Sequence, residues 1–240
     1  MSEEYSFPPY MEVMEEAVKV FAGTRMESYN GKDIKPLWDL NGEGFKSYKY
    51  LYKAPKLQKI VVGFQSFKEM LMSYAMMIWP DDEHDLPIFS SYWAENKKGS
   101  FFIVDLYPTA DCIVDIPYME MNLDPLEDAY DKGTRTYFPG LSGMSTNWFR
   151  ALSSPYCITG NIAPSTKDSQ NKIMELTMDY FKVFVDLWKK AEPKDKNYMK
   201  RLIERREAIR INFREKDPGG IMVVKAVGEE MAELSLEALF

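Results

Sequence analysis

The sequence has few of the residues on which covalent frameworks and metal sites are usually built. Its 240 residues include two cysteines, Cys112 and Cys157, and one histidine, His84. Two cysteines 45 positions apart give neither a disulfide framework nor a metal-ligand spacing, and a Cys112 and His84 nucleophilic pair has no supporting local signature. The sequence therefore predicts no disulfide-stabilised fold and no metal centre.

Longer sequence signals are missing as well. There is no Gly-x-Gly-x-x-Gly motif, and the glycine-containing residues 139–143 fit neither a P-loop nor a nucleophile elbow. The N-terminal residues do not resemble a signal peptide, and the longest apolar run is too short to span a bilayer. We therefore expect a cytoplasmic protein without a membrane span. Without a flavin, nicotinamide or metal motif, a redox function would have to draw its electrons from another protein.

Positive charge is concentrated in one stretch of an acidic chain. Residues 189–216 hold eleven Lys and Arg against five acidic residues, a local charge of +6. Since the whole chain carries −7, the remaining residues carry −13. This distribution favours the steering of an acidic protein partner over binding of nucleic acid, because most of the chain would repel phosphates. The alternative is an ordinary solvated helix face with internal ion pairs.

The apolar pattern predicts one domain, residues 1–240, with strands in the first half and helices at both ends. Helices are expected at residues 10–22, 126–131, 145–153, 172–190, 197–216 and 218–239. Strands are expected at residues 36–39, 45–53, 59–65, 70–79, 88–94, 100–106 and near 156–158. Short connections between the strands imply antiparallel neighbours. The predicted fold class is therefore α/β, a three-layer α/β/α sandwich around a mostly antiparallel sheet of about six strands.

The stretch with the most information is residues 80–108. Residues 88–94 and 100–106 are rich in aromatic and β-branched residues, and residues 95–99 have the composition of a turn, so the sequence predicts a hairpin. A period of two places Ser90 and Tyr92 on the same face. Small hydroxyls and a phenol on one face suit the floor of a pocket, although a hairpin that binds nothing can have the same pattern.

The same stretch resembles the ferredoxin-dependent bilin reductases, which reduce open-chain tetrapyrroles such as biliverdin. The resemblance is carried by Pro80, Leu86-Pro87-Ile88-Phe89, Asp105-Leu106-Tyr107-Pro108, the segment from Trp148 to Cys157, and Asp217-Pro218 followed by Gly228. The chain departs from the family pattern at Ser90-Ser91-Tyr92, where the family has Gly-x-Asp. The central aspartate that protonates the bilin in most members is thus replaced by Tyr92.

The resemblance implies a function and its partners. A bilin would be the substrate, reduced ferredoxin would be the external electron donor, and no tightly bound cofactor would be needed, because the bilin itself carries the radical. The acidic ferredoxin would dock on the basic stretch within residues 189–216. Because Tyr92 replaces the aspartate, three functions stay open: reduction of biliverdin or a partly reduced bilin, reduction of chlorophyll-derived linear tetrapyrroles, and non-catalytic binding of bilin or haem.

The resemblance also suggests site residues. Asp217 and Tyr92 are the candidate catalytic residues, and Asp217 is in addition a candidate N-cap for the last helix, since Pro218 follows it. A phenol is a weaker acid than a buried carboxylic acid, so Tyr92 could hydrogen-bond the substrate more readily than protonate it. The candidate substrate-binding residues are Ser90, Arg150, Arg210, Arg214 and His84, with Arg150 as a propionate anchor. His84, within Asp-Glu-His-Asp, is expected in an exposed turn.

Overall fold

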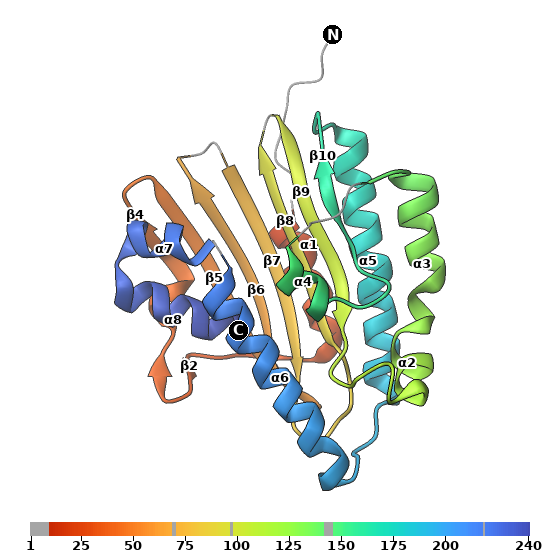
Figure 1. Cartoon of the computed structure of the whole chain (residues 1–240). Helices are drawn as coiled ribbons and strands as arrows, with labels where there is room; N and C mark the ends of the chain where they lie inside the picture. Colours follow the sequence, from red (N-terminus) through yellow and green to blue (C-terminus); the bar gives the residue numbers. More distant parts are fainter. Residues whose placement is uncertain (1–9, 69–70, 97, 142–145, 218) are drawn as a thin grey trace.

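An antiparallel sheet forms the middle of the molecule (Figure 1). The structure is a computed structural model that describes residues 10–68, 71–96, 98–141, 146–217 and 219–240. Within these residues the sheet has eight strands in the order β1-β5-β6-β7-β8-β9-β10, and β4 also pairs with β5. The strands are β1 (Thr24–Arg25), β4 (Leu40–Gly42), β5 (Phe45–Ala54), β6 (Leu57–Phe67), β7 (Leu71–Pro80), β8 (Ile88–Asn96), β9 (Gly99–Tyr107) and β10 (Ile158–Ile162). A separate small ribbon pairs β2 (Ser28–Tyr29) with β3 (Lys32–Asp33).

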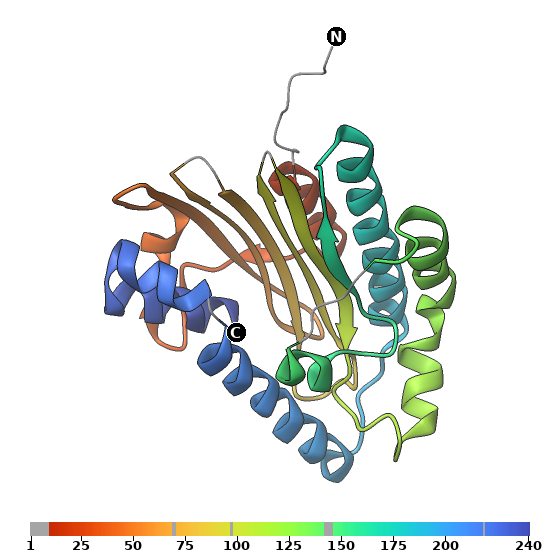
Figure 2. The same ribbon diagram turned by 45° about the horizontal axis from the view of Figure 1, so that its top comes forward.

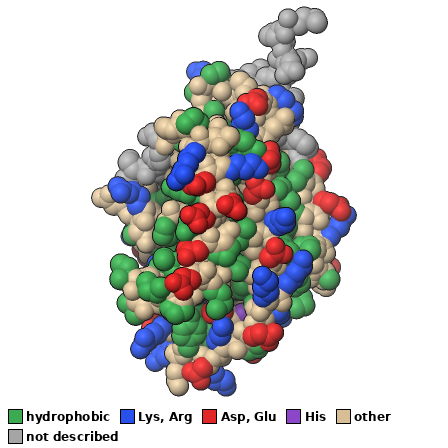
Figure 3. All heavy atoms as spheres, turned by 90° about the vertical axis from the view of Figure 1, so that its right-hand side faces the viewer, with side chains coloured by type: hydrophobic (Ala, Val, Ile, Leu, Met, Phe, Trp, Pro, Cys, Tyr) green, Lys and Arg blue, Asp and Glu red, His purple; other side chains and the backbone are tan. Residues whose placement is uncertain are grey.

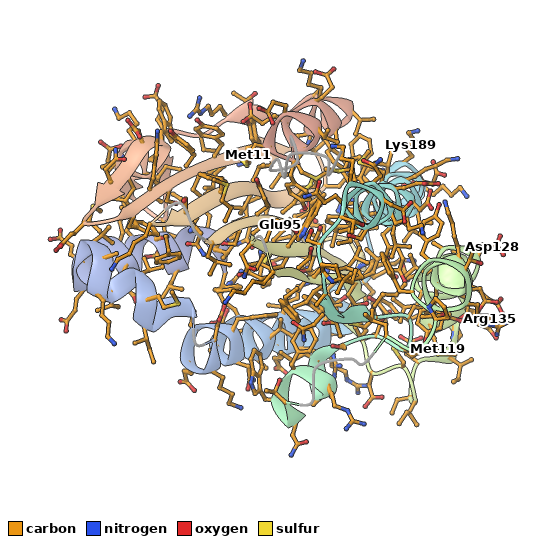
Figure 4. All side chains as sticks on the ribbon, turned by 90° about the horizontal axis from the view of Figure 1, so that it is seen from above. Met11, Glu95, Met119, Asp128, Arg135 and Lys189 are labelled. Carbon is orange, nitrogen blue, oxygen red and sulfur yellow. The ribbon has the colours of Figure 1, made fainter. Side chains whose placement is uncertain are left out.

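Helices cover both faces of the sheet (Figures 1 and 2). One face is covered by α1 (Tyr10–Val18), continued by η1 (Lys19–Phe21), and by α5 (Lys167–Lys190), with α2 (Ile116–Asn122), η3 (Asp124–Leu126), α3 (Glu127–Asp131) and η4 (Lys132–Tyr137) beyond α5. The other face is covered by α4 (Asn147–Leu152), α6 (Lys196–Lys216), α7 (Gly219–Val227) and α8 (Glu229–Leu239). Seen from above, α1 and α5 lie on one side of the sheet and α6 to α8 on the other (Figure 4). This arrangement confirms the predicted α/β/α sandwich.

The face toward α1 and α5 holds the largest apolar core. Phe89 and Trp93 of β8 are fully buried there, against Phe184 and Tyr180 of α5 and Met14 of α1 among others. One buried charged residue on this face is Glu95, labelled in Figure 4, whose carboxylate accepts hydrogen bonds from the indole of Trp93 at 2.8 Å and from the amide of Gln170 at 3.1 Å. These bonds compensate the burial of the carboxylate and tie β8 to α5. This face of the sheet is therefore structural.

Several predicted elements differ from the structure. Residues 35–39 form the short helix η2 instead of a strand, because Pro36 lacks an N–H and its φ suits a first helical turn. The predicted last helix is two helices, because Gly228 has φ of 83° and interrupts it. The helix α2 was not predicted, and the short strands β1 and β4 raise the strand number above six. Lys97 of the predicted turn and Pro218 of the predicted cap lie outside the described residues.

His84 is buried, so the expectation of an exposed turn was wrong. Only 6% of the residue is exposed, and its Nδ1 lies 2.7 Å from a carboxylate oxygen of Asp81. Arg206 of α6, itself 4% exposed, covers the turn and donates to the backbone carbonyls of Asp81 and His84. The turn is therefore closed by a buried guanidinium. Among the residues that the structure describes, no helix is both long enough and apolar enough to cross a membrane.

Candidate active site

A cavity of about 370 Å³ lies between the sheet and the layer formed by α4, α6, α7 and α8. Its floor is made by alternate residues of β5 to β9, and aromatic residues such as Trp148 of α4 and Phe213 of α6 border it. Met222 of α7 and Leu236 of α8 close it on the side away from the sheet. Polar groups are few, so most of the cavity surface is suited to an apolar, flat ligand.

The floor contains one row of residues that lie directly opposite each other on neighbouring strands. The row runs from Lys49 of β5 through Gly63 of β6, Ala75 of β7 and Tyr92 of β8 to Ile103 of β9. Gly63 and Ala75 add almost no bulk above the sheet. Because neighbouring strands are about 4.8 Å apart, the backbones of Lys49 and Tyr92 are roughly 14 Å apart, and the Lys49 side chain lies against Gly63.

Hydroxyl groups line the floor next to Tyr92. Ser73 of β7 forms a side-chain hydrogen bond with Tyr92, and Ser90 of β8 forms one with Tyr107 of β9. Ser90 and Tyr92 line the cavity, whereas Phe89 and Trp93 are buried on the opposite face of the sheet, in agreement with the predicted alternation along the hairpin.

Asp217 reaches the same cavity from the end of α6. Its carboxylate accepts a hydrogen bond of 2.8 Å from the backbone N–H of Gly219 at the start of α7. Burial raises the pKa of Asp217 above its ordinary value, and the bond from Gly219 partly offsets the effect. Burial also raises the pKa of Tyr92; the bond with Ser73 opposes this, and the negative charge of Asp217 adds to it. The structure thus brings Asp217, Tyr92 and Ser90 to one cavity.

The other four predicted site residues do not line this cavity. Arg150 is exposed on α4, and His84 lies in the closed turn described above. Arg210 lies with its guanidinium 4.9 Å above the ring of Trp79, and Arg214 is paired with Glu233. The charge of these arginines is therefore compensated by other protein groups or directed to solvent.

Lys49 is a cavity residue that the sequence prediction missed. It is 9% exposed, and its Nζ donates to both the backbone carbonyl oxygen and the side-chain Oγ of Ser235 in α8, each at 2.6 Å. Burial lowers the pKa of Lys49 to about 7. A period of two along β5 would have indicated it, since Phe45, Ser47 and Leu51 at the same parity are also buried.

Asp105 is a second buried acid next to the cavity. It is fully buried and lies opposite Ser90, and its two carboxylate oxygens accept hydrogen bonds from the backbone N–H of Ser154 at 2.9 Å and from its hydroxyl at 2.5 Å. Burial raises its pKa to about 6 although these bonds oppose the shift. Because Ser154 lies two residues after the end of α4, Asp105 ties the end of this helix, which carries Trp148, to β9. Within the described ranges, no group of three or more His, Cys, Asp and Glu side chains could hold a metal ion.

The chain belongs to the ferredoxin-dependent bilin reductases: the sequence model of that family matches residues 38–240. Membership makes the protein an oxidoreductase of this class, with ferredoxin as electron donor and a bilin as substrate, as the sequence resemblance predicted.

The known proteins that are similar to it include the following two. The chain is 24% identical to phycoerythrobilin:ferredoxin oxidoreductase of Prochlorococcus marinus over 198 aligned residues. The aligned region covers 75% of this chain and 70% of the relative. Its fold matches the crystal structure of phytochromobilin synthase from tomato in complex with biliverdin, with a TM-score of 0.80 and 18% identity over 95% of this chain and 80% of the other. Neither comparison favours a reductase of chlorophyll catabolites or a non-catalytic carrier.

Proposed function

We propose that this protein reduces biliverdin, or a partly reduced bilin, within the cavity between the sheet and α6 to α8. The observation that carries the proposal is the floor of the cavity. Gly63 and Ala75 leave the floor between Lys49 and Tyr92 low, and Phe213 and Trp148, which contact each other, add aromatic surface to the same cavity. A flat conjugated tetrapyrrole fits such a layer, because it can bury both ring faces while its polar edges meet the few polar side chains.

The reaction adds two electrons and two protons to each double bond that is reduced. Ferredoxin delivers the electrons one at a time, and the bilin carries the unpaired electron between the two transfers. The protein therefore has to bind the bilin, exclude water and supply protons at chosen carbons. Asp217 is suited to proton donation, since burial raises its pKa toward the working pH and a larger fraction of its carboxyl groups carries a proton. The same carboxylate also accepts a hydrogen bond from the N–H of Gly219 at the start of α7, so Asp217 is suited both to hold the start of this helix and to donate a proton.

An absorbance titration tests the proposed function directly. Biliverdin is added to the protein under anaerobic conditions, followed by ferredoxin, ferredoxin reductase and NADPH. We expect a bound spectrum that changes on reduction to that of a product with a shorter conjugated system. A bound spectrum that reduction leaves unchanged would indicate a carrier, and the absence of a bound spectrum would refute the proposal.

We place the ferredoxin contact on the first half of α6. The basic stretch contributes exposed Lys196, Lys200 and Arg201 there, whereas Arg206 is buried and is no docking residue. Arg205 donates a hydrogen bond to the backbone carbonyl of Pro108. Pro108 directly follows Tyr107, the last residue of β9, which lines the cavity. At 1.5 Å per residue along α6, Arg201 lies about 18 Å from Phe213 in the cavity. The face formed by α3 and α5 instead mixes acidic and basic side chains, several of them paired, such as Lys132 with Glu175 and Asp179, so it offers an acidic partner less unpaired positive charge (Figure 3).

Charge reversal on α6 is expected to weaken the ferredoxin contact selectively. In Lys200→Glu/Arg201→Glu, the ferredoxin concentration for half-maximal turnover should rise about tenfold or more at low salt, because opposite charges steer the encounter and salt screens them. Bilin affinity should stay unchanged. Steady-state turnover at several salt concentrations measures the effect, and Lys182→Glu, an exposed lysine of α5, is the control. Equal ferredoxin dependence in the double variant and the parent would contradict this placement.

Tyr92 is expected to leave the conjugated ring system of bound biliverdin without an added proton. A phenol holds its proton about six pKa units more tightly than a carboxyl group in reference peptides, and burial raises the pKa of Tyr92 further. The bound spectrum should therefore lack the red-shifted band of a protonated bilin. In Tyr92→Asp this band should appear as the pH is lowered, whereas Tyr92→Phe should bind biliverdin without it. If neither substitution alters the bound spectrum or the product, Tyr92 does not face the pigment.

A further inference from the structure

Lys49 is the one lysine or arginine among the described residues that line the cavity. Its ammonium group is held in place by Ser235, whose carbonyl oxygen and hydroxyl each accept one of its hydrogen bonds at 2.6 Å. An ammonium group has three N–H donors, so a third remains beyond the two directed at Ser235. Both residues belong to the cavity wall. A ligand carboxylate at this wall would therefore meet a preoriented donor, and its negative charge would favour the protonated form of Lys49, whose pKa burial lowers to about 7.

Further cations lie behind this wall. Lys59 is fully buried on the neighbouring strand, and its Nζ donates to the backbone carbonyls of Glu237 and Ala238, each at 3.0 Å. Burial, followed by the charges of Arg210 and Lys49, lowers the pKa of Lys59. The acids at this end are paired with other groups: Glu237 with Lys32, Glu233 with Arg214 and Glu207 with Arg210. Lys49 is therefore the basic group that a ligand in the cavity would meet at the β5 and α8 end.

The opposite end of the floor has the opposite character. Asp217, the one acidic residue among the described cavity residues, lies close enough to Tyr92 for its charge to act on the phenol. A ligand carboxylate beside Asp217 would be repelled, whereas beside Lys49 it would be attracted. The backbones of Lys49 and Tyr92 are roughly 14 Å apart, three strand spacings. The side chain of Lys49 crosses part of this distance, since its Cγ and Cε would lie 3.8 Å from a Cβ at Gly63. A ring system bound to Lys49 would therefore extend over Ala75 to Tyr92 and beyond.

We infer that Lys49 binds a carboxylate of the substrate, a propionate of the bilin, and so fixes which way round the bilin lies in the cavity. The inference rests on the proposed function, since it assumes that a bilin occupies the cavity. The propionate lies at the β5 and α8 wall, and the conjugated rings extend over Ala75 toward Tyr92 and Asp217. Lys49 takes the role that the sequence suggested for Arg150, which lies exposed on α4.

A pair of ligands separates this role from a structural one. Biliverdin carries two propionates, and its dimethyl ester keeps the same conjugated system without the negative charges. The dissociation constants of both ligands are measured by absorbance titration for the parent protein and for Lys49→Met, which keeps an unbranched side chain as far as Cε and removes the amine with its charge. The ratio of the two constants within one protein is insensitive to a general loss of folded protein.

We expect the parent to bind biliverdin about ten- to a hundredfold more tightly than the ester, the range for one charge-assisted hydrogen bond. In Lys49→Met this preference should disappear, because the affinity for biliverdin falls while that for the ester is retained. Lys49→Arg should keep most of the preference. Ser235→Ala, which removes one acceptor of the lysine but no charge, should keep it as well.

Two results would overturn the inference. One is a parent protein that binds biliverdin and its dimethyl ester equally well. The other is a Lys49→Met variant that keeps the parental preference for biliverdin, including a variant whose affinity for both ligands falls by the same factor. In that second case the role of Lys49 is confined to its bonds with Ser235 of α8. A parent protein that binds neither ligand would refute the proposed function instead, so the two failures are distinguishable.

Discussion

Asp217→Asn is expected to lower the rate of bilin reduction about 10²- to 10⁴-fold, the usual loss when a general acid is removed. The fold should change little, because an asparagine oxygen can accept the bond from Gly219 and Asn caps helices nearly as well as Asp. Bilin affinity should also stay close to that of the parent. Single-turnover reduction with an excess of reduced ferredoxin measures the rate, and thermal unfolding measures the fold. A variant that reduces the bilin at the parental rate would leave capping as the only role of Asp217.

The same substitution should change how stability depends on pH. Burial raises the pKa of Asp217 in the folded state above its unfolded value, so the folded protein binds more protons through this group than the unfolded chain does. The contribution of Asp217 to the free energy of unfolding is therefore greatest below its pKa in the unfolded chain. This contribution is lost as the pH rises through its pKa in the folded protein. The Asn variant lacks this component. Denaturant unfolding at a series of pH values in the mildly acidic range, parent against variant, checks the sign.

Gly63→Ile is expected to abolish biliverdin binding while the protein stays folded. A Cβ at this position would have its nearest neighbours at 3.7 to 3.8 Å, which is ordinary van der Waals contact, so the strand itself tolerates a side chain. The rest of an isoleucine would then stand on the floor of the cavity, where the bilin is proposed to lie. Its branched side chain also suits a strand. Absorbance titration measures the loss of binding, which we expect to exceed a hundredfold.

Gly63→Ala is the matched control for this experiment. It adds one methyl group, should raise the free energy of unfolding by about 0.5–1 kcal/mol because glycine is costly within a strand, and should leave binding measurable. Parental affinity in a folded Gly63→Ile variant would mean that the bilin does not lie over β6.

The cavity face of the hairpin could be predicted from the sequence, but the floor of the cavity could not. Alternation within one strand is a local property, and it placed Ser90 and Tyr92 correctly. That Lys49, Gly63 and Ala75 fall in register with Tyr92 depends on the pairing of four strands, which is fixed by turns and by packing over both faces. Gly63, a glycine inside a predicted strand, was the one available signal in the sequence for this part of the floor. Glycine weakens a strand, so its presence there indicates a position where a ligand or another backbone comes close.

The arginines show a different limit of sequence analysis. Helical spacing identifies the face of a helix that carries charge, but not the partner that each charge meets. Arg206, Arg210 and Arg214 lie four residues apart on α6, yet one is buried under the 81–86 turn, one lies over Trp79 and one pairs with Glu233. Only tertiary packing separates these three environments, so the basic count of residues 189–216 overstated the charge available to a partner.

The alternation along β8 divides this strand into positions that can be changed independently. Ser90 and Tyr92 meet the cavity, whereas Phe89, Ser91 and Trp93 are packed on the opposite face, where Ser91 shares a hydrogen bond of 2.6 Å with Tyr10 of α1. Randomising the first set in a laboratory library would sample new pigments and new regiochemistry while the folding core stays constant. Randomising the second set would mostly yield unfolded chains. A directed-evolution campaign on this protein can therefore be confined to every second residue of the central strands.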